Sequence, residues 1–125
     1  MENREQSAMN EIKRLDQSAR RSRALIHNGI VYLSGQVPTQ RPNDVQQQAR
    51  QVLDKIDSLL REAGTDKSRI LSATVWLRTM DDFESFNAVW DAWVAPGQTP
   101  TRSCGKVEMN DPACLVEISV AAAVA

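Results

Sequence analysis

The chain has 125 residues, a net charge of -1 and 42% hydrophobic residues, which is the size and composition of one soluble globular domain. The near-neutral charge argues against nucleic acid as a partner, and the absence of a long apolar stretch or a signal-peptide core predicts a cytoplasmic protein that does not bind membranes. Cys104 and Cys114 have no companion residues at metal-ligand spacing, which predicts two reduced thiols and no metal.

The first part of the chain is polar and has few apolar anchors. We expect residues 1–13 to be a mobile tail and residues 14–125 to form the single domain. A weak strand signal lies near Arg14–Ala19. The basic run Arg20–Arg23 that follows is more typical of a solvated strand entry than of a binding patch.

Two apolar runs then indicate a β-hairpin. Ala24–His27 and Ile30–Leu33 are joined by Asn28-Gly29. An Asn-Gly pair accepts the positive φ angles of a type I′ turn, which joins two antiparallel strands. We assign His27, beside the turn, no catalytic role.

A long amphipathic helix is predicted after the chain break at Pro38 and Pro42. Asn43 or Asp44 can cap its N-terminus, and Gly64 ends it. Its apolar positions recur at three- and four-residue spacing: Val45, Ala49, Val52, Leu53, Ile56, Leu59, Leu60 and Ala63.

A strand over Arg69–Arg78 is predicted from alternation with a period of two. The residues expected to pack under helices are Leu71, Ala73, Val75 and Leu77. The residues expected on the other face are Ile70, Ser72, Thr74 and Trp76. This second face is too apolar for open water and too polar for a core, so it fits a subunit contact.

A second helix is expected from Asp81 or Asp82 to about Val94, with Asp81 and Glu84 at the spacing of a capping box. Its apolar stripe consists of Phe83, Phe86, Val89, Trp90, Trp93 and Val94. Two more strands follow, over 101–108 and 113–124. The order β-β-α-β-α-β-β predicts an α+β fold, because right-handed crossovers put both helices on one face of the sheet.

Arg102 and Cys104 share one face of the first of these last two strands. A hairpin loop over Met109–Pro112 would set Cys104 opposite Glu117 and Arg102 opposite Ser119. A guanidinium, a thiol and a carboxylate would then converge. The guanidinium can hold a substrate carboxylate through two parallel hydrogen bonds, and Glu117 can act on water.

Each of these candidates has a structural alternative. Glu117 can equally form an ion pair with Arg102, and packing is the commonest fate of a strand cysteine such as Cys104, ahead of nucleophile or proton shuttle. Asn87 lies on an apolar stripe and needs a hydrogen-bond partner, for which a backbone carbonyl is the favoured choice. Gly35, after Ser34, is typical of a bulge or of close ligand approach.

Six segments carry a family resemblance: Tyr32–Pro38 (YLSGQVP), the helix ending in Ala63-Gly64, Ala73–Leu77 (ATVWL), Phe86–Trp90 (FNAVW), Pro100–Cys104 (PTRSC) and Val116–Ile118 (VEI). In this order and spacing the chain resembles the reactive intermediate deaminase (Rid) family from about Ala24 to Val124. The resemblance implies a chorismate-mutase-like fold, a homotrimeric barrel with sites in the clefts between subunits, and no metal or organic cofactor. It also implies hydrolysis of enamines and imines, such as 2-iminoacids, to 2-oxoacids and ammonia.

Carried over by motif, the resemblance assigns roles to several residues. Arg102 would bind the substrate carboxylate, Glu117 would position the attacking water, and the cleft would be lined by Cys104, Ser34, Gly35 and Asn87. Active members commonly have an aromatic residue about thirteen positions before the serine, where this chain has Arg21. A second cation there favours a more acidic substrate, or an altered or lost activity.

The altered region around Arg21 leaves open a second class of function, a non-catalytic trimeric module that binds a small carboxylate or a protein. Ribonuclease or translation-inhibitor activity, sometimes attributed to such proteins, is a third possibility. The near-neutral charge and the lack of a basic, aromatic surface argue against this third function.

Overall fold

The computed structural model describes residues 10–124. Its elements are, in chain order, β1 (Lys13–Gln17), β2 (Ser22–His27), β3 (Ile30–Leu33), α2 (Val45–Glu62), β4 (Ile70–Leu77), α3 (Phe83–Trp93), β5 (Thr101–Lys106) and β6 (Val116–Ala123). Short 3₁₀ turns precede β4 and α3. The predicted order is confirmed, and the weak strand signal near its start corresponds to β1. The predicted tail, residues 1–13, lies mainly outside the described residues.

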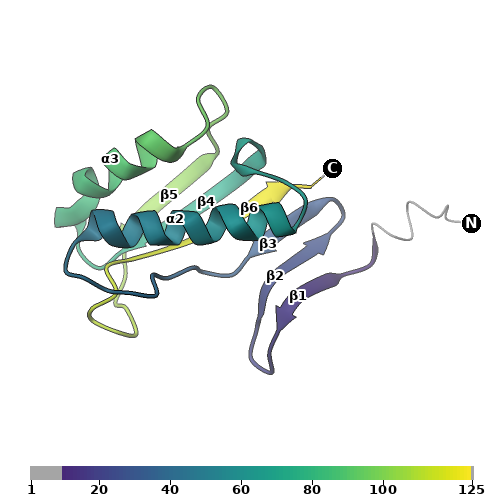
Figure 1. Cartoon of the computed structure of the whole chain (residues 1–125), viewed down its shortest axis with the longest axis horizontal. Coiled ribbons are helices and arrows are strands. Elements are labelled where there is room, and N and C mark those ends of the chain that lie inside the picture. The colour runs from purple at the N-terminus through teal and green to yellow at the C-terminus, as the bar shows by residue number, and fades with distance from the viewer. Residues whose placement is uncertain (1–9, 125) are drawn as a thin grey trace, which may run out of the picture.

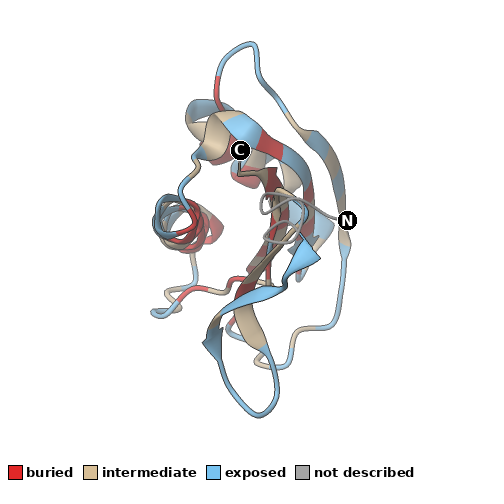
Figure 2. Ribbon diagram, turned by 90° about the vertical axis from the view of Figure 1, so that its right-hand side faces the viewer, coloured by how far each residue is buried: buried red, intermediate tan, exposed pale blue. Residues whose placement is uncertain are grey.

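The strands form one mixed sheet in the order β1-β2-β3-β6-β4-β5. The β4–β5 pair is parallel, and the other neighbours are antiparallel. Both helices cover the same face, and the β1–β2 ribbon extends beyond them (Figure 1). The edge-on view of Figure 2 shows that buried residues lie between the helices and the sheet. The α+β class and the placement of both helices on one face are confirmed.

The hairpin and the long helix form as their local sequences predict. Asn28 and Gly29 adopt φ angles of 52° and 76° between β2 and β3. The Asp44 carboxylate caps α2 by accepting hydrogen bonds from the backbone N–H groups of Gln46 and Gln47, which hold the pKa of Asp44 below its usual value. The helix ends before Gly64, which has a φ of +86°.

The start of α3 differs from the prediction. Its N-cap residue, Asp82, makes no side-chain capping hydrogen bond, so the capping box expected from Asp81 and Glu84 is wrong. A 3₁₀ turn comes first, and the Thr79 hydroxyl accepts a hydrogen bond from the N–H of Asp81 at 3.2 Å. The capping residue is therefore Thr79, at the start of the 3₁₀ turn that leads into α3.

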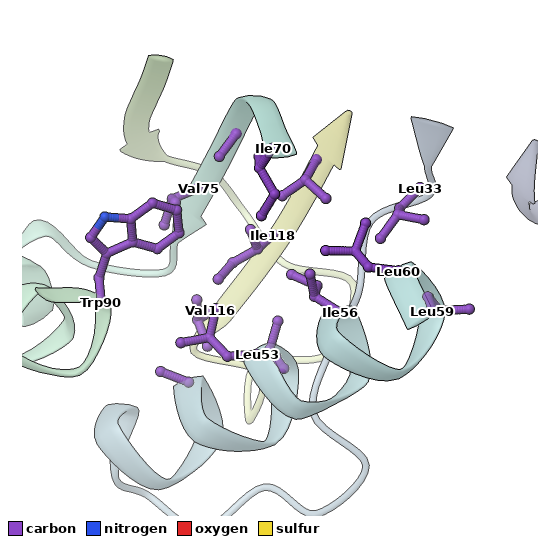
Figure 3. Close-up of a cluster of buried hydrophobic side chains, with 14 of the residues drawn as sticks. Leu33, Leu53, Ile56, Leu59, Leu60, Ile70, Val75, Trp90, Val116 and Ile118 are labelled. Carbon is purple, nitrogen blue, oxygen red and sulfur yellow. The ribbon is translucent and has the colours of Figure 1, made fainter. Parts of the chain in front are cut away.

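One continuous core lies between the helices and the sheet (Figure 3). The apolar stripe of α2 is buried as predicted, and α3 contributes Phe86, Val89 and Trp90. Residues fully enclosed in the core include Leu53, Ile56, Leu60, Val75, Leu77, Val116 and Ile118. Burial of each such side chain stabilises the fold by about 1.5–3 kcal/mol.

The first residues of β4 correct the predicted alternation. Ala73, Val75 and Leu77 face the core as expected, but Ile70 is buried and Leu71 is exposed. The reason is a β-bulge: Ile70 pairs with Ala122 and Ser72 with Ala121, which leaves Leu71 as an extra residue. The extra residue inverts the alternation at that end of the strand.

The predicted hairpin between β5 and β6 is wrong, because β4 lies between these strands. The α3 crossover returns the chain to the free edge of β4, where β5 pairs in parallel, whereas β6 pairs with both β3 and β4. Cys104 therefore lies opposite Val75, and Glu117 lies opposite Trp76.

The face of the sheet that the helices leave uncovered is mixed in character, as predicted for Thr74 and Trp76. Tyr32 is 46% exposed, Leu71 48% and Trp76 37%, while smaller polar side chains such as Thr74 lie between them. We call this surface the open face. Large exposed apolar side chains that lie on one surface often mark a contact with another molecule.

Candidate functional site

A cleft of about 370 Å³ opens where the segment after β3 meets the loop before β6. It is lined by Arg21, Ser34, Gly35, Val37, Arg41, Met109, Asn110, Asp111, Cys114 and Glu117. Four of the predicted site residues, Arg21, Ser34, Gly35 and Glu117, are thus brought together. This volume lies at the lower end of the range for ligand pockets, roughly 300–1,000 Å³, and suits a small metabolite.

Ser34 is held by a hydrogen-bond network. Its hydroxyl donates to the carbonyl of Arg23 at 3.1 Å and accepts from the Nη1 group of Arg21 at 3.0 Å. The buried Gln36 side chain donates to the carbonyl of Ser34 at 2.9 Å. The backbone of Gln36 pairs in both directions with Ile118 on β6. This pairing fixes the Ser34 segment beside the start of β6.

Gly35 packs directly against the side chain of Glu117. A Cβ atom at residue 35 would overlap the Glu117 carboxylate and would lie 2.8 Å from its Cδ atom. The φ angle of Gly35 is not in the left-handed region, so the glycine leaves room for the Glu117 carboxylate and does not serve a special backbone conformation. The close approach expected from the sequence is therefore made by a side chain of the same chain.

On the opposite wall of the cleft, Arg41 and Asp111 form an ion pair with an Nη1–Oδ2 distance of 2.6 Å. The Ala113 N–H and the Arg41 guanidinium hold the pKa of Asp111 below its usual value. Behind this wall, burial and the charges of Arg23 and Arg41 lower the pKa of Lys55. The charged side chains that line the cleft are thus two arginines, Arg21 and Arg41, and two carboxylates, Asp111 and Glu117.

Three further predicted residues, Arg102, Cys104 and Asn87, lie elsewhere. Arg102 and Cys104 do share one face of β5, the face under α3. The Arg102 guanidinium rests on an aromatic cluster, 5.3 Å from the ring centroid of Trp90, with Phe83 and Phe86 about equally close at 6.0 Å and 5.9 Å. Burial raises the pKa of the Cys104 thiol, although Arg102 opposes this shift.

Asn87 lies on α3 among the same aromatic residues. Its Oδ1 atom is buried and has no hydrogen-bond partner within residues 10–124. The backbone carbonyl that the sequence favours as a partner could accept only from the Nδ2 group, so Oδ1 needs a separate donor. A buried carbonyl oxygen without a donor costs about 1–3 kcal/mol, so this atom calls for a partner from outside the chain.

The two groups of residues do not meet within one chain. Glu117 lies on the open face, because its neighbour Trp76 is exposed there, whereas Arg102 lies on the helix-covered face. The structural Arg102–Glu117 ion pair is therefore wrong, and Arg102 pairs with no carboxylate of residues 10–124. The predicted convergence of Arg102, Cys104 and Glu117 on one patch fails because it depended on the β5–β6 hairpin.

Sequence reasoning missed Arg41, Asp111 and Cys114 as cleft residues. Arg41 and Asp111 are seventy positions apart, and no local pattern relates them. Cys114 is a buried free thiol whose pKa is raised by burial. His27, by contrast, lies outside both groups, beside its turn, as expected.

Known proteins match the chain over nearly its whole length. The family model described as endoribonuclease L-PSP matches residues 11–124. A RutC family protein from Haemophilus ducreyi is 46% identical over 113 residues, which cover 90% of this chain and 97% of the relative. The chain belongs to the Rid family. The resemblance read from its motifs is confirmed.

Solved structures agree with the fold of this Rid protein. A YjgF-family protein from Neisseria meningitidis has a TM-score of 0.90 and 38% identity, and the match covers 94% of this chain and 98% of that one. A Rid-family protein of unknown function from Yersinia pestis has a TM-score of 0.81 and 33% identity, over 86% and 90% of the two chains. The family assignment and the fold are therefore consistent.

Residues 10–124 of this Rid protein contain neither a membrane-spanning helix nor a cluster of metal-ligating side chains. None of the helices in this range is long and apolar enough to cross a membrane. Within the same range, histidine, cysteine and acidic side chains do not gather in groups of three or more that could hold a metal ion.

Proposed function

We propose that the protein hydrolyses 2-iminoacids, and the enamines in equilibrium with them, to 2-oxoacids and ammonia at a site shared by neighbouring subunits of a homotrimer. The observation that carries this proposal is the division of the predicted residues. The cleft of one chain contains Glu117 and Ser34, and the distant β5 edge contains Arg102. A second copy of the chain can place its Arg102 beside the cleft of the first copy, so that Arg102 and Glu117 meet in one site.

Two surfaces of the fold support assembly from identical subunits. β5 has a neighbour on one side only, and an unpaired strand edge usually needs to be covered or blunted. The open face carries exposed Trp76 and Tyr32. A ring of three copies covers both surfaces through one repeated contact that closes on itself.

Arg102 is suited to hold the α-carboxylate of the substrate. Its guanidinium is half-buried over aromatic rings and is paired with no carboxylate of residues 10–124, so its forked donors are available to an anion. Cys104, beside it, has a raised thiol pKa and therefore stays protonated near neutral pH. We infer that this thiol packs beside the carboxylate and does not act as a nucleophile.

Glu117 is suited to position water. It accepts a hydrogen bond from a water molecule, which adds through its oxygen to the imine carbon as the C=N π electrons move to nitrogen. The proton released from the water passes to that nitrogen, directly or through Glu117. The hydroxyl proton is then transferred to the amine nitrogen as the C–N bond breaks, so that ammonia leaves and the C=O bond of the 2-oxoacid forms. Orientation by Arg102 and proton transfer by Glu117 supply the rate enhancement.

Mixed trimers test both the chemistry and the shared site. Arg102→Ala and Glu117→Gln are each expected to lose 2-oxoacid formation from imines generated by an amino-acid oxidase. If the two residues of one site come from different chains, a random equal mixture of the variants in one trimer restores about a quarter of the sites. If they come from the same chain, no site is restored.

The mixed trimers are made by unfolding the two variants together and letting them reassemble. Each variant taken alone through this treatment is the control. Full activity of the Arg102→Ala homotrimer, or no effect of the wild-type protein on imine loss, contradicts the proposal. Binding of a small carboxylate with no turnover of any imine would instead favour a non-catalytic binding module. The net charge of -1 gives no support to cleavage of RNA.

A further inference from the structure

The cleft contains two guanidinium groups in different electrostatic states. Arg41 is neutralised by Asp111, with 2.6 Å between the charged atoms. Arg21 lines the same cleft and forms no ion pair with a carboxylate of residues 10–124. Arg21 is therefore an uncompensated positive charge beside Glu117, the other charged group of the cleft that lies outside an ion pair.

The orientation of Arg21 is fixed by Ser34. The Ser34 hydroxyl hydrogen is committed to the carbonyl of Arg23, so the oxygen offers a lone pair to the Nη1 group of Arg21 at 3.0 Å. Gln36 also donates to this hydroxyl oxygen, at 3.3 Å. Because this contact occupies one of the five donors of the guanidinium, the others are left for an anion. Ser34 thus acts as a positioning residue for Arg21.

We propose that Arg21 binds a second carboxylate, so that the cleft selects 2-iminoacids with an acidic side chain. This proposal rests on the proposed function: the α-carboxylate binds Arg102 of the neighbouring subunit, the imine carbon lies at Glu117, and the side-chain carboxylate reaches Arg21. A second carboxylate near Glu117 is repelled unless a cation compensates for that charge, and the guanidinium can hold it through two hydrogen bonds.

Competing substrates provide the test. Imines are generated by oxidases from aspartate or glutamate and, separately, from alanine or 2-aminobutyrate, and kcat/KM is measured for wild type and Arg21→Gln. Wild type is expected to favour the dicarboxylic imines, and Arg21→Gln to lower the dicarboxylic-to-monocarboxylic ratio by about 10- to 100-fold, the effect of losing a charge-assisted hydrogen-bonded pair.

Arg20→Gln is the matched control, since Arg20 is the exposed neighbour of Arg21 and does not line the cleft. It removes the same charge from the same segment and should leave the ratio unchanged. An equal loss on both substrate classes in Arg21→Gln, or an unchanged ratio, overturns the proposal and leaves Arg21 as a structural partner of Ser34.

A binding measurement separates this inference from the deaminase proposal. Calorimetry compares 2-oxoglutarate and oxaloacetate with 2-oxobutanoate, which are product-like 2-oxoacids with and without a second carboxylate. Tighter binding of the dicarboxylates, lost in Arg21→Gln and kept in Arg20→Gln, supports the second carboxylate site even if no imine is turned over. Equal affinity of wild type for all three compounds refutes it, even if imines are hydrolysed.

Discussion

The cleft and the β5 edge differ in how completely their polar groups are satisfied. In the cleft, Ser34 and Gln36 form a hydrogen-bond network within one chain, and Arg41 forms an ion pair with Asp111. At the edge, Arg102 has no carboxylate and the buried Asn87 Oδ1 has no donor within residues 10–124. Buried polar groups are almost always paired in native proteins. The hydrogen bonds of Ser34 and Gln36 are thus made within one chain, whereas Arg102 and Asn87 keep bonding capacity that the proposed subunit contact could use.

The largest effect is expected from breaking the interface itself. Trp76→Glu puts a charge on the open face, directly opposite Glu117 on β6. We expect the proposed trimer to dissociate and the proposed deaminase activity to disappear together, because the charge must be desolvated for subunits to meet. Sedimentation and imine turnover measure the two losses, and circular dichroism checks that the chain is folded.

Trp76→Lys also puts a charge on the open face, but a lysine is not repelled by Glu117. This variant therefore shows whether dissociation comes from burying a charge or from repulsion between two carboxylates. It should dissociate the trimer as well. Ser58→Glu, on an exposed position of α2, introduces the same charge elsewhere and should change neither property. Sedimentation of the wild type at monomer mass in dilute native buffer would rule out the shared site.

A smaller effect is expected from disturbing the cleft alone. Gly35→Ala introduces a methyl group into the space of the Glu117 carboxylate, whose flexible end can swing aside. The melting temperature should change little, but displacement of the carboxylate by about 1 Å should lower kcat by about 100-fold. In a Glu117→Gln background the same substitution should add little, and a full additional loss there would show that Gly35 acts independently.

The smallest effect concerns the pH dependence of the cleft wall. The pKa of Asp111 is lowered in the folded chain, by the Ala113 N–H and then by Arg41, so its ionised form stabilises the fold. This stabilisation is present above the ordinary value of 3.8 and is lost as pH falls through the lower, folded pKa. Urea midpoints should therefore fall less steeply below about pH 4 for Asp111→Asn than for wild type. Parallel profiles would contradict this.

Local patterns predicted the elements of the fold but not all of their pairings. The Asn28-Gly29 turn and the α2 stripe depend on neighbouring residues, and both formed as expected. The placement of β5 beside β4 depends on where α3 returns the chain, and a short loop before β6 suggested a hairpin instead. The bulge at Leu71 was also not predicted, because a single extra residue does not visibly interrupt an alternating sequence.

The candidate site was predictable by residue type and not by geometry. The motifs named Arg102 and Glu117, but their separation on opposite faces follows from strand order alone. The contact between Arg21 and Ser34 spans thirteen residues across the β2–β3 hairpin, so only a resemblance to known proteins pointed to that position. The Arg41–Asp111 pair joins distant loops and had no sequence signal.

The central position of β6 has a consequence for synthesis of the protein. β6 is the last strand to leave the ribosome, yet it lies between β3 and β4. A nascent chain that lacks it can pair β1, β2 and β3 as one ribbon and β4 with β5 as another, but no strand of the described sheet other than β6 joins the two ribbons. Such long-range pairing is slow, and unpaired edges invite association with other chains. We therefore expect the sheet to close only once β6 has been synthesised, because β6 is the strand that pairs with both β3 and β4.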